Sequence, residues 1–356
     1  MSSGFAPKRI LLVQTAFLGD VVLATALHRR LSVAFPEAEI HWLVRPDAEA
    51  VVASLVPPGR ILVYAKRGER AGLSGFFAMA AILAERKFDA SVAVQRSFRT
   101  AALLWRAGIP LRVGFSGAAG AFFYTRRVPY RGRHARDRMV RLVEGLGVSA
   151  VDPPSPFLPV SPEAQVAIAT RLAEAGVLPD ERILVIAPGS AWQTKQWPAR
   201  HFGLVAGNLL ARGYDRGVVV GGGGDGGLAQ EVALAAGESG PRILDWTGRT
   251  TAAELIATID RAALCLANDS APGHIAGAVD TPLVAIFGPK TPEMGFAPLG
   301  RDVQIAGRED LACRPCSRHG SKRCPLGTHA CMEELDPATV IHAVQELKIG
   351  IDRGGG

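Results

Sequence analysis

Short apolar segments alternate with longer segments of helical periodicity along the first half of the chain. The apolar segments are RILLVQ, IHWLV, ILVYA and DASVAVQ, and they are followed by residues 20–35, DAEAVVASLV, SGFFAMAAILAER and RTAALLWRAG. Strands that alternate with helices predict a parallel, doubly wound sheet. The predicted strands are almost wholly apolar, as expected when helices cover both faces of the sheet.

The alternation restarts after the proline-rich segment 151–165, VDPPSPFLPVSPEAQ, which has neither period and is interpreted as a linker. The later apolar segments are RILVIAPGS, GVVVGGGGDG, RILDWTG, LCLANDS and PLVAIFGP. We therefore expect two similar α/β domains, residues 1–155 and 156–335, that face one another. Ligands of such sheets bind at the carboxyl ends of the strands, so the side chains directly after each strand are the candidates.

The composition is that of a folded protein with a large core. Of 356 residues, 48% are hydrophobic and 21% are charged, which excludes a disordered chain. The longest apolar run, GFFAMAAIL, is shorter than the roughly 18 to 20 residues of a membrane span, so we expect only peripheral membrane contact. The start, MSSGFAPKR followed by ILLV, lacks the pattern of a signal peptide, and we expect a cytoplasmic protein.

Positive charge is in excess, and it gathers in one segment. The net charge is +7, and residues 124–141, YTRRVPYRGRHARDRMVR, would favour a nucleic acid, an acidic lipid surface or a phosphorylated substrate. A solvated basic face explains the segment equally well. Nucleic acid is disfavoured because no nucleic-acid-binding motif is found and few aromatic residues separate the basic ones.

The glycine-rich segment VVVGGGGDGGLAQEVALAA satisfies G-x-G-x-x-G with Gly221, Gly223 and Gly226, and Asp245 follows about 20 residues later. The pattern by itself suggests a dinucleotide site. A run this rich in glycine matches easily, however, and it follows the second strand of its domain rather than the first. A loop that faces a nucleotide is the favoured interpretation, ahead of a plain tight turn and of NAD(P) binding.

The segment APGSAWQTKQWPARHF contains polar residues directly after a predicted strand. Ser190 follows this strand, and Lys195 precedes Trp197-Pro198, where proline at the first helical position would start a helix. A lysine here could neutralise the phosphate oxygens of a departing nucleotide. The alternative is a surface lysine beside a tryptophan that anchors the loop.

A third segment, LANDSAPGHIAGAVDTPLVAIFGP, predicts a strand, a polar turn, a helix of small residues and a second strand. Asp269, Ser270 and the amides around Ala271–His274 form the start of the helix, where unpaired N–H groups can bind an anion. Asp269 and Ser270 could equally be helix caps, and His274 could be a core histidine.

Four of the five cysteines, Cys313, Cys316, Cys324 and Cys331, have the spacing C-x2-C-x7-C-x6-C, and His319 and His329 lie nearby. This spacing could hold a structural zinc ion, but it lacks a second C-x2-C pair. Reduced structural thiols in a cytoplasmic protein are the favoured interpretation.

Three of these segments resemble a known family. FLGDVVLATAL, PGSAWQTKQWP and NDSAPGHIAGAVDTPLVAIFGPKTP occur in the order found in glycosyltransferase family 9, the ADP-heptose:lipopolysaccharide heptosyltransferases. Within the family, CPLGTHACM is most similar to heptosyltransferase II sequences. The resemblance implies the GT-B fold, with two Rossmann-like domains facing across a cleft, and residues 336–356 could form a helix that packs back on the first domain.

The resemblance also implies roles for single residues. Asp20, the acid of the GD motif, would be the catalytic base, and Lys195 would contact the diphosphate of the donor. The Asp-Thr-Gly-x-x-His turn of the family corresponds here to Asp269, Ser270, Ala271 and His274. It departs from the family in Ser270 and in Ala271-Pro272, and the proline removes one N–H donor. Ser190 would also face the diphosphate, and Thr250 falls where the family contacts adenosine.

For the acceptor, the expected residues are Gly19, beside the base, and Arg96, Arg99 and Arg136, which could bind acidic groups. The implied reaction is inverting transfer of heptose from ADP-L-glycero-D-manno-heptose to an inner-core heptose at the inner membrane surface, with no cofactor, since no D-x-D pair could hold a metal ion. The alternatives are a family 9 enzyme with another acceptor, such as heptosyltransferase I, and a non-catalytic protein that binds nucleotide-sugars.

Overall fold

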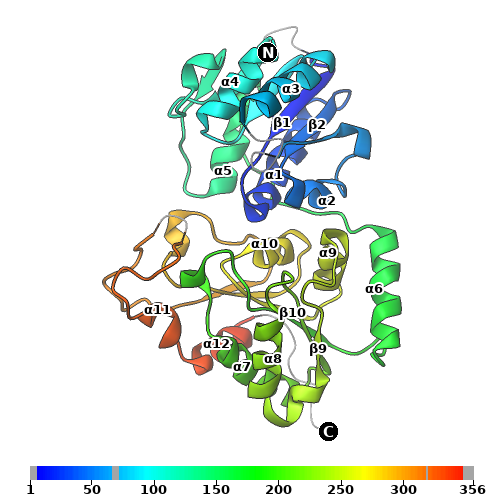
Figure 1. Cartoon of the computed structure of the whole chain (residues 1–356), viewed down its shortest axis with the longest axis vertical. Helices are drawn as coiled ribbons and strands as arrows, with labels where there is room; N and C mark the ends of the chain where they lie inside the picture. The colour runs from blue at the N-terminus through cyan, green and yellow to red at the C-terminus, as the bar shows by residue number, and fades with distance from the viewer. Residues whose placement is uncertain (1–5, 66–71, 318–319, 348–356) are drawn as a thin grey trace. The chain divides into compact units, whose positions relative to one another are not determined.

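The chain divides into two units at the proline-rich segment. The computed structural model describes residues 6–65, 72–317 and 320–347, and the units are residues 1–158 and 159–356 (Figure 1). No helix or strand forms between residues 151 and 161. The expected linker ends earlier than residue 165, because Ser161 caps the following helix and accepts a hydrogen bond from the amide of Ala164 at 3.2 Å.

The first unit contains a sheet of six parallel strands. They are β1 (Arg9–Val13), β2 (Glu39–Val44), β3 (Ile61–Val63), β4 (Ala90–Ala93), β5 (Leu111–Phe115) and β6 (Arg126–Val128), in the order β3-β2-β1-β4-β5-β6. The first four confirm the predicted strands. The last two were not predicted, because their sequences, LRVGF and RRV, are interrupted by arginine and glycine.

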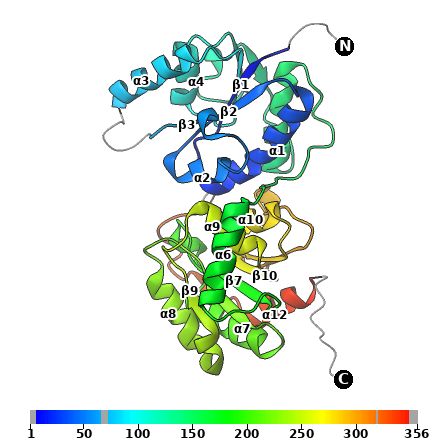
Figure 2. The same cartoon turned by 90° about the vertical axis from the view of Figure 1, so that its right-hand side faces the viewer.

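Helices lie on both faces of this sheet (Figures 1 and 2). They are α1 (Leu18–Ala34), α2 (Glu49–Val52), α3 (Gly72–Glu85), α4 (Phe98–Arg106) and α5 (Ala135–Val140), with shorter 3-10 turns η1 (Pro46–Ala48), η2 (Pro58–Arg60), η3 (Ala121–Phe123) and η4 (Arg141–Leu146). Helix α3 packs on α4, and α1 packs on α5. The helix expected over DAEAVVASLV is reduced to η1 and the single turn of α2.

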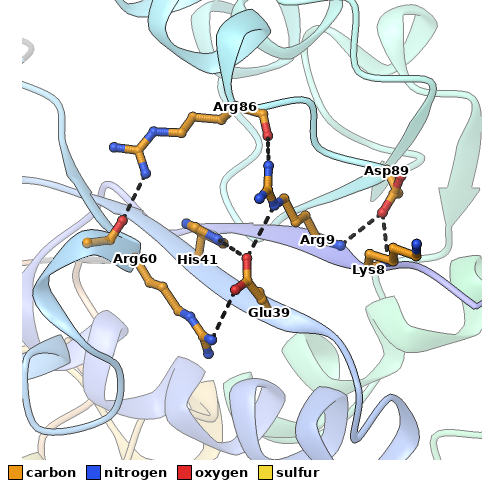
Figure 3. A network of polar contacts seen from close by, with 8 residues as sticks. Lys8, Arg9, Glu39, His41, Arg60, Arg86 and Asp89 are labelled. Carbon is orange, nitrogen blue, oxygen red and sulfur yellow. Dashed lines mark hydrogen bonds and ion pairs between the residues drawn. The ribbon is translucent and has the colours of Figure 1, made fainter.

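A polar network joins the amino ends of the strands (Figure 3). The Asp89 carboxylate accepts hydrogen bonds from the amides of Lys8 and Arg9 at 2.7 and 2.9 Å. Glu39 pairs with Arg9 and Arg60, both at 3.2 Å. The network therefore fastens the starts of β1, β2 and β4 to one another, at the edge of the sheet opposite to the carboxyl ends.

The second unit repeats the same architecture. Its strands are β7 (Ile183–Ala187), β8 (Arg216–Val219), β9 (Ile243–Asp245), β10 (Leu264–Asn268), β11 (Leu283–Ile286) and β12 (Val303–Ala306), in the order β12-β11-β10-β7-β8-β9. All neighbours are parallel. Since the first three strands of each unit run outward in one direction and the last three in the other, both sheets have the Rossmann-like strand order.

The helices of this unit are α6 (Pro162–Glu174), α7 (Ala199–Ala211), α8 (Gly226–Ala235), α9 (Ala252–Asp260), α10 (Ala271–Ala278), α11 (Ala330–Glu333) and α12 (Pro337–Gln345), with 3-10 turns η5 (Gln193–Lys195), η6 (Gly237–Arg242) and η7 (Pro292–Met294). Pro198 is the N-cap of α7, so the prediction that it is the first helical residue was one position off.

The final helix packs with its apolar side against the second unit. Helix α12 packs on α7, β11 and β12, and Val340 and Val344 belong to the buried core of this unit. Residues 348–356 lie outside the described part of the chain. Among the described residues, no helix is long and apolar enough to cross a membrane.

Candidate functional site

In both units several candidate residues follow the two strands at which the strand order reverses. The connections that follow these two strands leave toward opposite sides of the sheet, and a crevice opens between them at the carboxyl ends of the strands. Open α/β sheets bind their ligands in this crevice. In the first unit the two strands are β1, followed by Asp20, and β4, followed by Arg96. In the second unit they are β7, followed by Lys195, and β10, followed by Asp269.

Lys195 and Asp269 form a buried ion pair. The Lys195 ammonium lies 2.7 Å from Oδ2 of Asp269, and only 9% and 4% of the two side chains are exposed. The same ammonium donates to the Asp269 carbonyl oxygen at 3.3 Å. The interpretation of Lys195 as a surface lysine is therefore wrong, because the side chain lies inside the unit against the loop that follows β10.

A second lysine, Lys290, completes the cluster and was not identified from the sequence. It follows the neighbouring strand β11, its ammonium lies 3.3 Å from the same Asp269 oxygen, and its side chain is 6% exposed. The ammonium also lies 4.8 Å from the centre of the Phe296 ring. The signal that could have found it is a lysine a few residues after the strand in PLVAIFGPK, a placement similar to that of Ser190 after β7.

The charges of the lysine–aspartate cluster, Lys195, Asp269 and Lys290, keep the carboxyl group ionised. Burial by itself would raise the pKa of Asp269, but Lys195 and Lys290, together with His274, outweigh burial and lower it. Two ammonium groups then face one carboxylate, and the cluster has an excess positive charge. A buried group of this kind attracts an anion with several oxygens.

The loop that carries Lys195 is held to β10 by hydrogen bonds. The amide of Trp197 donates to Oδ1 of Asn268 at 3.1 Å, and the amide group of Asn268 donates to the Pro188 carbonyl at 2.7 Å. The Trp197 indole, 1% exposed, donates to the Leu335 carbonyl at 3.1 Å. These contacts hold the 188–197 loop rigidly, so that Lys195 keeps its position without help from a ligand.

The turn after β10 begins helix α10. Ser270 is the N-cap, but its side chain makes no capping hydrogen bond, and Oγ has no hydrogen-bond partner among the described residues. Asp269 is not the cap, since its carboxylate is engaged by the lysines. Ala271 and Pro272 are partly buried, whereas His274 is buried. The hydroxyl of Ser270 and the amides of the first turn remain suited to an anion, apart from Pro272.

The glycine-rich loop lies against the loop of Ser190. The Asp225 carboxylate accepts a hydrogen bond from the Gly222 amide at 2.8 Å and lies so close to Gly189 that a Cβ there would be 2.5 Å from Oδ2. A Cβ at Gly248, whose φ is +67°, would meet Gly223 at 2.5 Å. Gly189 and Gly248 therefore have no room for a side chain beside the glycine-rich loop. Within the loop, Gly224 and Gly227 have open space beside them.

Ser190 and Thr250 lie partly exposed beside this loop region. The Ser190 carbonyl accepts a hydrogen bond from the Gln196 side chain at 2.9 Å. Thr250 precedes Thr251, which caps α9 in a capping box with Glu254, so the capping role falls on the neighbour of Thr250. Both side chains follow strands of one sheet, β7 and β9.

In the first unit, Asp20 lies in the first turn of α1, with Phe17 as the N-cap and Gly19 before it. Both Gly19 and Asp20 are partly exposed. A carboxylate in the first turn of a helix interacts favourably with the helix dipole. The Gln14 side chain, at the end of β1, donates to the Asp20 carbonyl at 3.4 Å and ties the turn to the sheet.

The three candidate arginines differ in how they are held. Arg96 is exposed and lies 4.4 Å from the centre of the Tyr130 ring. Arg99 donates to the Tyr64 hydroxyl at 2.8 Å and to the Gly72 carbonyl at 2.6 Å. Arg136 donates to Asp137 at 2.7 Å and to the Pro153 carbonyl at 3.0 Å. Arg99 and Arg136 therefore have structural partners, whereas Arg96 extends over a ring at the protein surface.

The cysteine segment is spread between surface and core. Cys313 and Cys316 are exposed, Cys324 is partly exposed, and Cys331 is buried in α11. Burial raises the pKa of Cys331 to about 11, which keeps this thiol protonated. Within the described residues no group of three or more His, Cys, Asp or Glu side chains is arranged to hold a metal ion, and His319 lies outside them.

Two parallel sheets of this kind, each with the Rossmann-like strand order, form the GT-B fold. The fold matches the structure of Escherichia coli ADP-heptose LPS heptosyltransferase II with a TM-score of 0.77, at 21% identity over 95% of this chain and 97% of that one. It matches a family 9 glycosyl transferase of Veillonella parvula with a TM-score of 0.82, at 24% identity over 95% and 96%.

Among curated proteins, lipopolysaccharide heptosyltransferase 3 of Escherichia coli is 29% identical over 282 residues, which are 76% of this chain and 81% of that protein. Residues 76–326 match the model of glycosyltransferase family 9 (heptosyltransferase). The chain therefore belongs to this family and is a glycosyltransferase, as the three sequence segments predicted.

Proposed function

We propose that the protein transfers L-glycero-D-manno-heptose from its ADP ester to a heptose of the lipopolysaccharide inner core, with inversion at the anomeric carbon. The observation that carries this proposal is the lysine–aspartate cluster at the point where the strand order of the second unit reverses. It offers excess positive charge to a diphosphate. The family and the names of its relatives supply the class of sugar and acceptor.

In this proposal the second unit binds the donor. The ammonium groups of Lys195 and Lys290 and the hydroxyls of Ser190 and Ser270 would contact the diphosphate oxygens. The amides at the start of α10, around Ala271 and His274, would add hydrogen-bond donors. As the anomeric C–O bond breaks, negative charge grows on the diphosphate, and fixed positive groups stabilise that charge more than they stabilise the intact donor.

The first unit would bind the acceptor. Asp20 takes the proton of the attacking hydroxyl while the acceptor oxygen forms a bond to the anomeric carbon and ADP leaves with the electron pair of the broken bond. One carboxylate is enough, because ADP leaves without being protonated by an enzyme acid. Gly19 would leave room for the sugar beside the carboxylate, and Arg96 is the arginine most free to meet acidic groups of the acceptor.

We infer that the second inner-core heptose is the one added, as in heptosyltransferase II. The CPLGTHACM segment supports this assignment, and the fold match to a heptosyltransferase II is consistent with it. The competing candidate is a neighbouring step of core assembly, and the identity to a heptosyltransferase 3 favours that candidate. A lipid-anchored acceptor would bring the enzyme to the cytoplasmic face of the inner membrane as a peripheral protein.

Two buried ammonium groups, those of Lys195 and Lys290, can supply positive charge to a diphosphate, and this supports transfer without a metal ion. The experiment compares ADP-heptose, UDP-glucose and GDP-mannose as donors for core lipid A that already carries one heptose, each with and without EDTA. We expect transfer from ADP-heptose alone and no effect of EDTA. Transfer from a UDP- or GDP-sugar would refute the donor, and loss of activity in EDTA would refute the metal-independent reaction.

A further inference from the structure

The first unit exposes several large apolar side chains on three neighbouring elements. Leu73 and Phe77 of α3 are 76% and 51% exposed, Phe98 and Trp105 of α4 are 51% and 54% exposed, and Phe122 of η3 is 68% exposed. Single exposed apolar residues are ordinary on soluble proteins. Five exposed apolar side chains on elements that pack against one another are unusual and require an explanation.

These side chains, together with Phe123, are called the aromatic face: Leu73, Phe77, Phe98, Trp105, Phe122 and Phe123. The ring of Phe122 lies 4.3 Å from that of Phe123 and 6.1 Å from that of Phe98, and Trp105 lies 5.2 Å from Phe123. Arg106 of α4 reaches across to α3, with its guanidinium 5.7 Å from the centre of the Phe77 ring. Figures 1 and 2 show α3 and α4 side by side on the outside of the first unit.

Helix α3 has the composition that such a surface requires. Its sequence, GLSGFFAMAAILAE, carries a single charged residue, Glu85, in its last position. Met79, Ala80 and Leu83 are buried against the unit, while Leu73, Phe77 and Ala81 point away from it. A surface helix normally turns charged residues to solvent, so a helix that is apolar on its outer side is suited to a nonpolar environment.

The part of the chain that carries α4 and η3 is rich in arginine. Residues 90–136 contain nine arginines and no aspartate or glutamate. Six of the nine are exposed: Arg96, Arg106, Arg126, Arg127, Arg131 and Arg133. Arg126 and Arg127 follow η3 within four residues of Phe123, and Arg106 lies on Phe77. The surface therefore combines apolar rings with guanidinium groups that bind phosphate.

We propose that the aromatic face docks on a bilayer that contains anionic phospholipid. The rings of Phe77, Trp105 and Phe122 enter the level of the headgroups, and the surrounding arginines bind lipid phosphates. A phospholipid surface fits this combination because it offers many phosphates beside apolar chains over a broad area. The inference deepens the proposed function, since the unit proposed to bind a lipid-anchored acceptor carries the surface.

The experiment measures sedimentation of the full chain with vesicles that contain no acceptor. One set of vesicles is phosphatidylcholine, and the other is an equal mixture of phosphatidylcholine and phosphatidylglycerol. The variants are Phe77→Ser/Phe122→Ser and Arg126→Ser/Arg127→Ser. The matched control is Leu234→Ser, because Leu234 of α8 is 74% exposed in the second unit. Binding of ADP by every variant verifies that it is folded.

We expect binding to the anionic vesicles that weakens with salt, and little binding to phosphatidylcholine. The double arginine variant should bind about thirtyfold more weakly, and the double phenylalanine variant should lose binding by at least about tenfold. Leu234→Ser should bind as the unchanged protein does. Absence of binding by the unchanged protein, or binding by both double variants as strong as that of the unchanged protein, would overturn the proposal.

Two further results distinguish lipid docking from dimerisation and from the proposed function. Concentration-dependent dimerisation that Phe77→Ser/Phe122→Ser abolishes, without vesicle binding, would assign the aromatic face to a second copy of the chain and overturn lipid docking. Failure of heptose transfer with intact vesicle binding would refute the proposed function and leave the docking surface standing.

Discussion

The Lys290 ammonium lies 3.3 Å from the Asp269 carboxylate, on the same oxygen that Lys195 contacts at 2.7 Å. Because Lys195 and Asp269 alone would form a neutral pair, Lys290 supplies the excess positive charge of the cluster. We predict that Lys290→Met weakens ADP binding by about tenfold or more, as expected for the loss of a hydrogen bond to a charged group. Isothermal titration calorimetry with ADP measures the change.

Two controls make this prediction specific. Adenosine lacks the phosphates, so its affinity should be the same for Lys290→Met and the unchanged protein. Lys322→Met removes an exposed lysine of the same unit and should leave ADP affinity unchanged. An ADP affinity that survives in Lys290→Met would show that Lys290 only neutralises Asp269.

Asp269→Asn should destabilise the protein, because it leaves two buried ammonium groups facing one another without a carboxylate. Removal of one partner from a buried ion pair costs about 3 to 5 kcal/mol. Lys290→Met, which leaves a neutral Lys195–Asp269 pair, should cost much less. Thermal unfolding of the two variants without ligand compares them, and equal melting temperatures would contradict the assignment of charges in the cluster.

Asp20→Asn tests the catalytic base. The asparagine keeps the size of the side chain but cannot take a proton, so the transfer rate should fall by about 10² to 10⁴. ADP binding should persist, because the donor is assigned to the second unit. The assay follows heptose transfer at saturating donor concentration. Near-normal turnover of the variant would show that Asp20 is not the catalytic base.

The first unit should lose stability in mild acid because of His28. The Trp42 indole donates to Nδ1 of His28 at 3.2 Å, and burial lowers the pKa of this histidine from 6.5 to about 4. The folded state therefore holds His28 neutral while the unfolded chain takes up a proton below about pH 6.5. Between pH 6.5 and 4 this difference removes about 3 kcal/mol from the free energy of unfolding.

The measurement is denaturant unfolding followed by circular dichroism at pH 7.5 and at pH 5. His28→Gln should reduce the loss of stability between the two pH values. His342→Gln is the matched control, since the side chain of His342 is 71% exposed, and it should leave the loss as it is. If His28→Gln loses as much stability between the two pH values as the unchanged protein does, a group other than His28 causes the acid sensitivity.

The alternation of apolar and helical segments was enough to predict two doubly wound sheets, because strands buried on both faces must be apolar along their whole length. It missed β5 and β6, since LRVGF and RRV place arginines in strands near the edge of the sheet, where one face is less covered. Helix α2 was overestimated because apolar periodicity in EAVVASLV cannot show where tertiary packing ends a helix.

The candidate site was predicted in part. Lys195 and Asp269 were chosen because both follow strands, but the sequence cannot show that residues 74 positions apart share one ion pair. Whether Asp269 caps a helix or binds a charge was open until Lys290 and Lys195 were found on its carboxylate. Lys290 was not predicted because Gly288 and Pro289, which indicate a turn, stand between β11 and the lysine.

The central claim is that this chain adds a heptose to an inner-core acceptor. The direct measurement is transfer of labelled heptose from ADP-heptose to core lipid A that carries either no heptose or one heptose. We predict a product with the acceptor that already carries one heptose and none with the other. Transfer only to the acceptor without heptose would contradict the type II assignment, and no transfer to either would contradict the inner-core acceptor altogether.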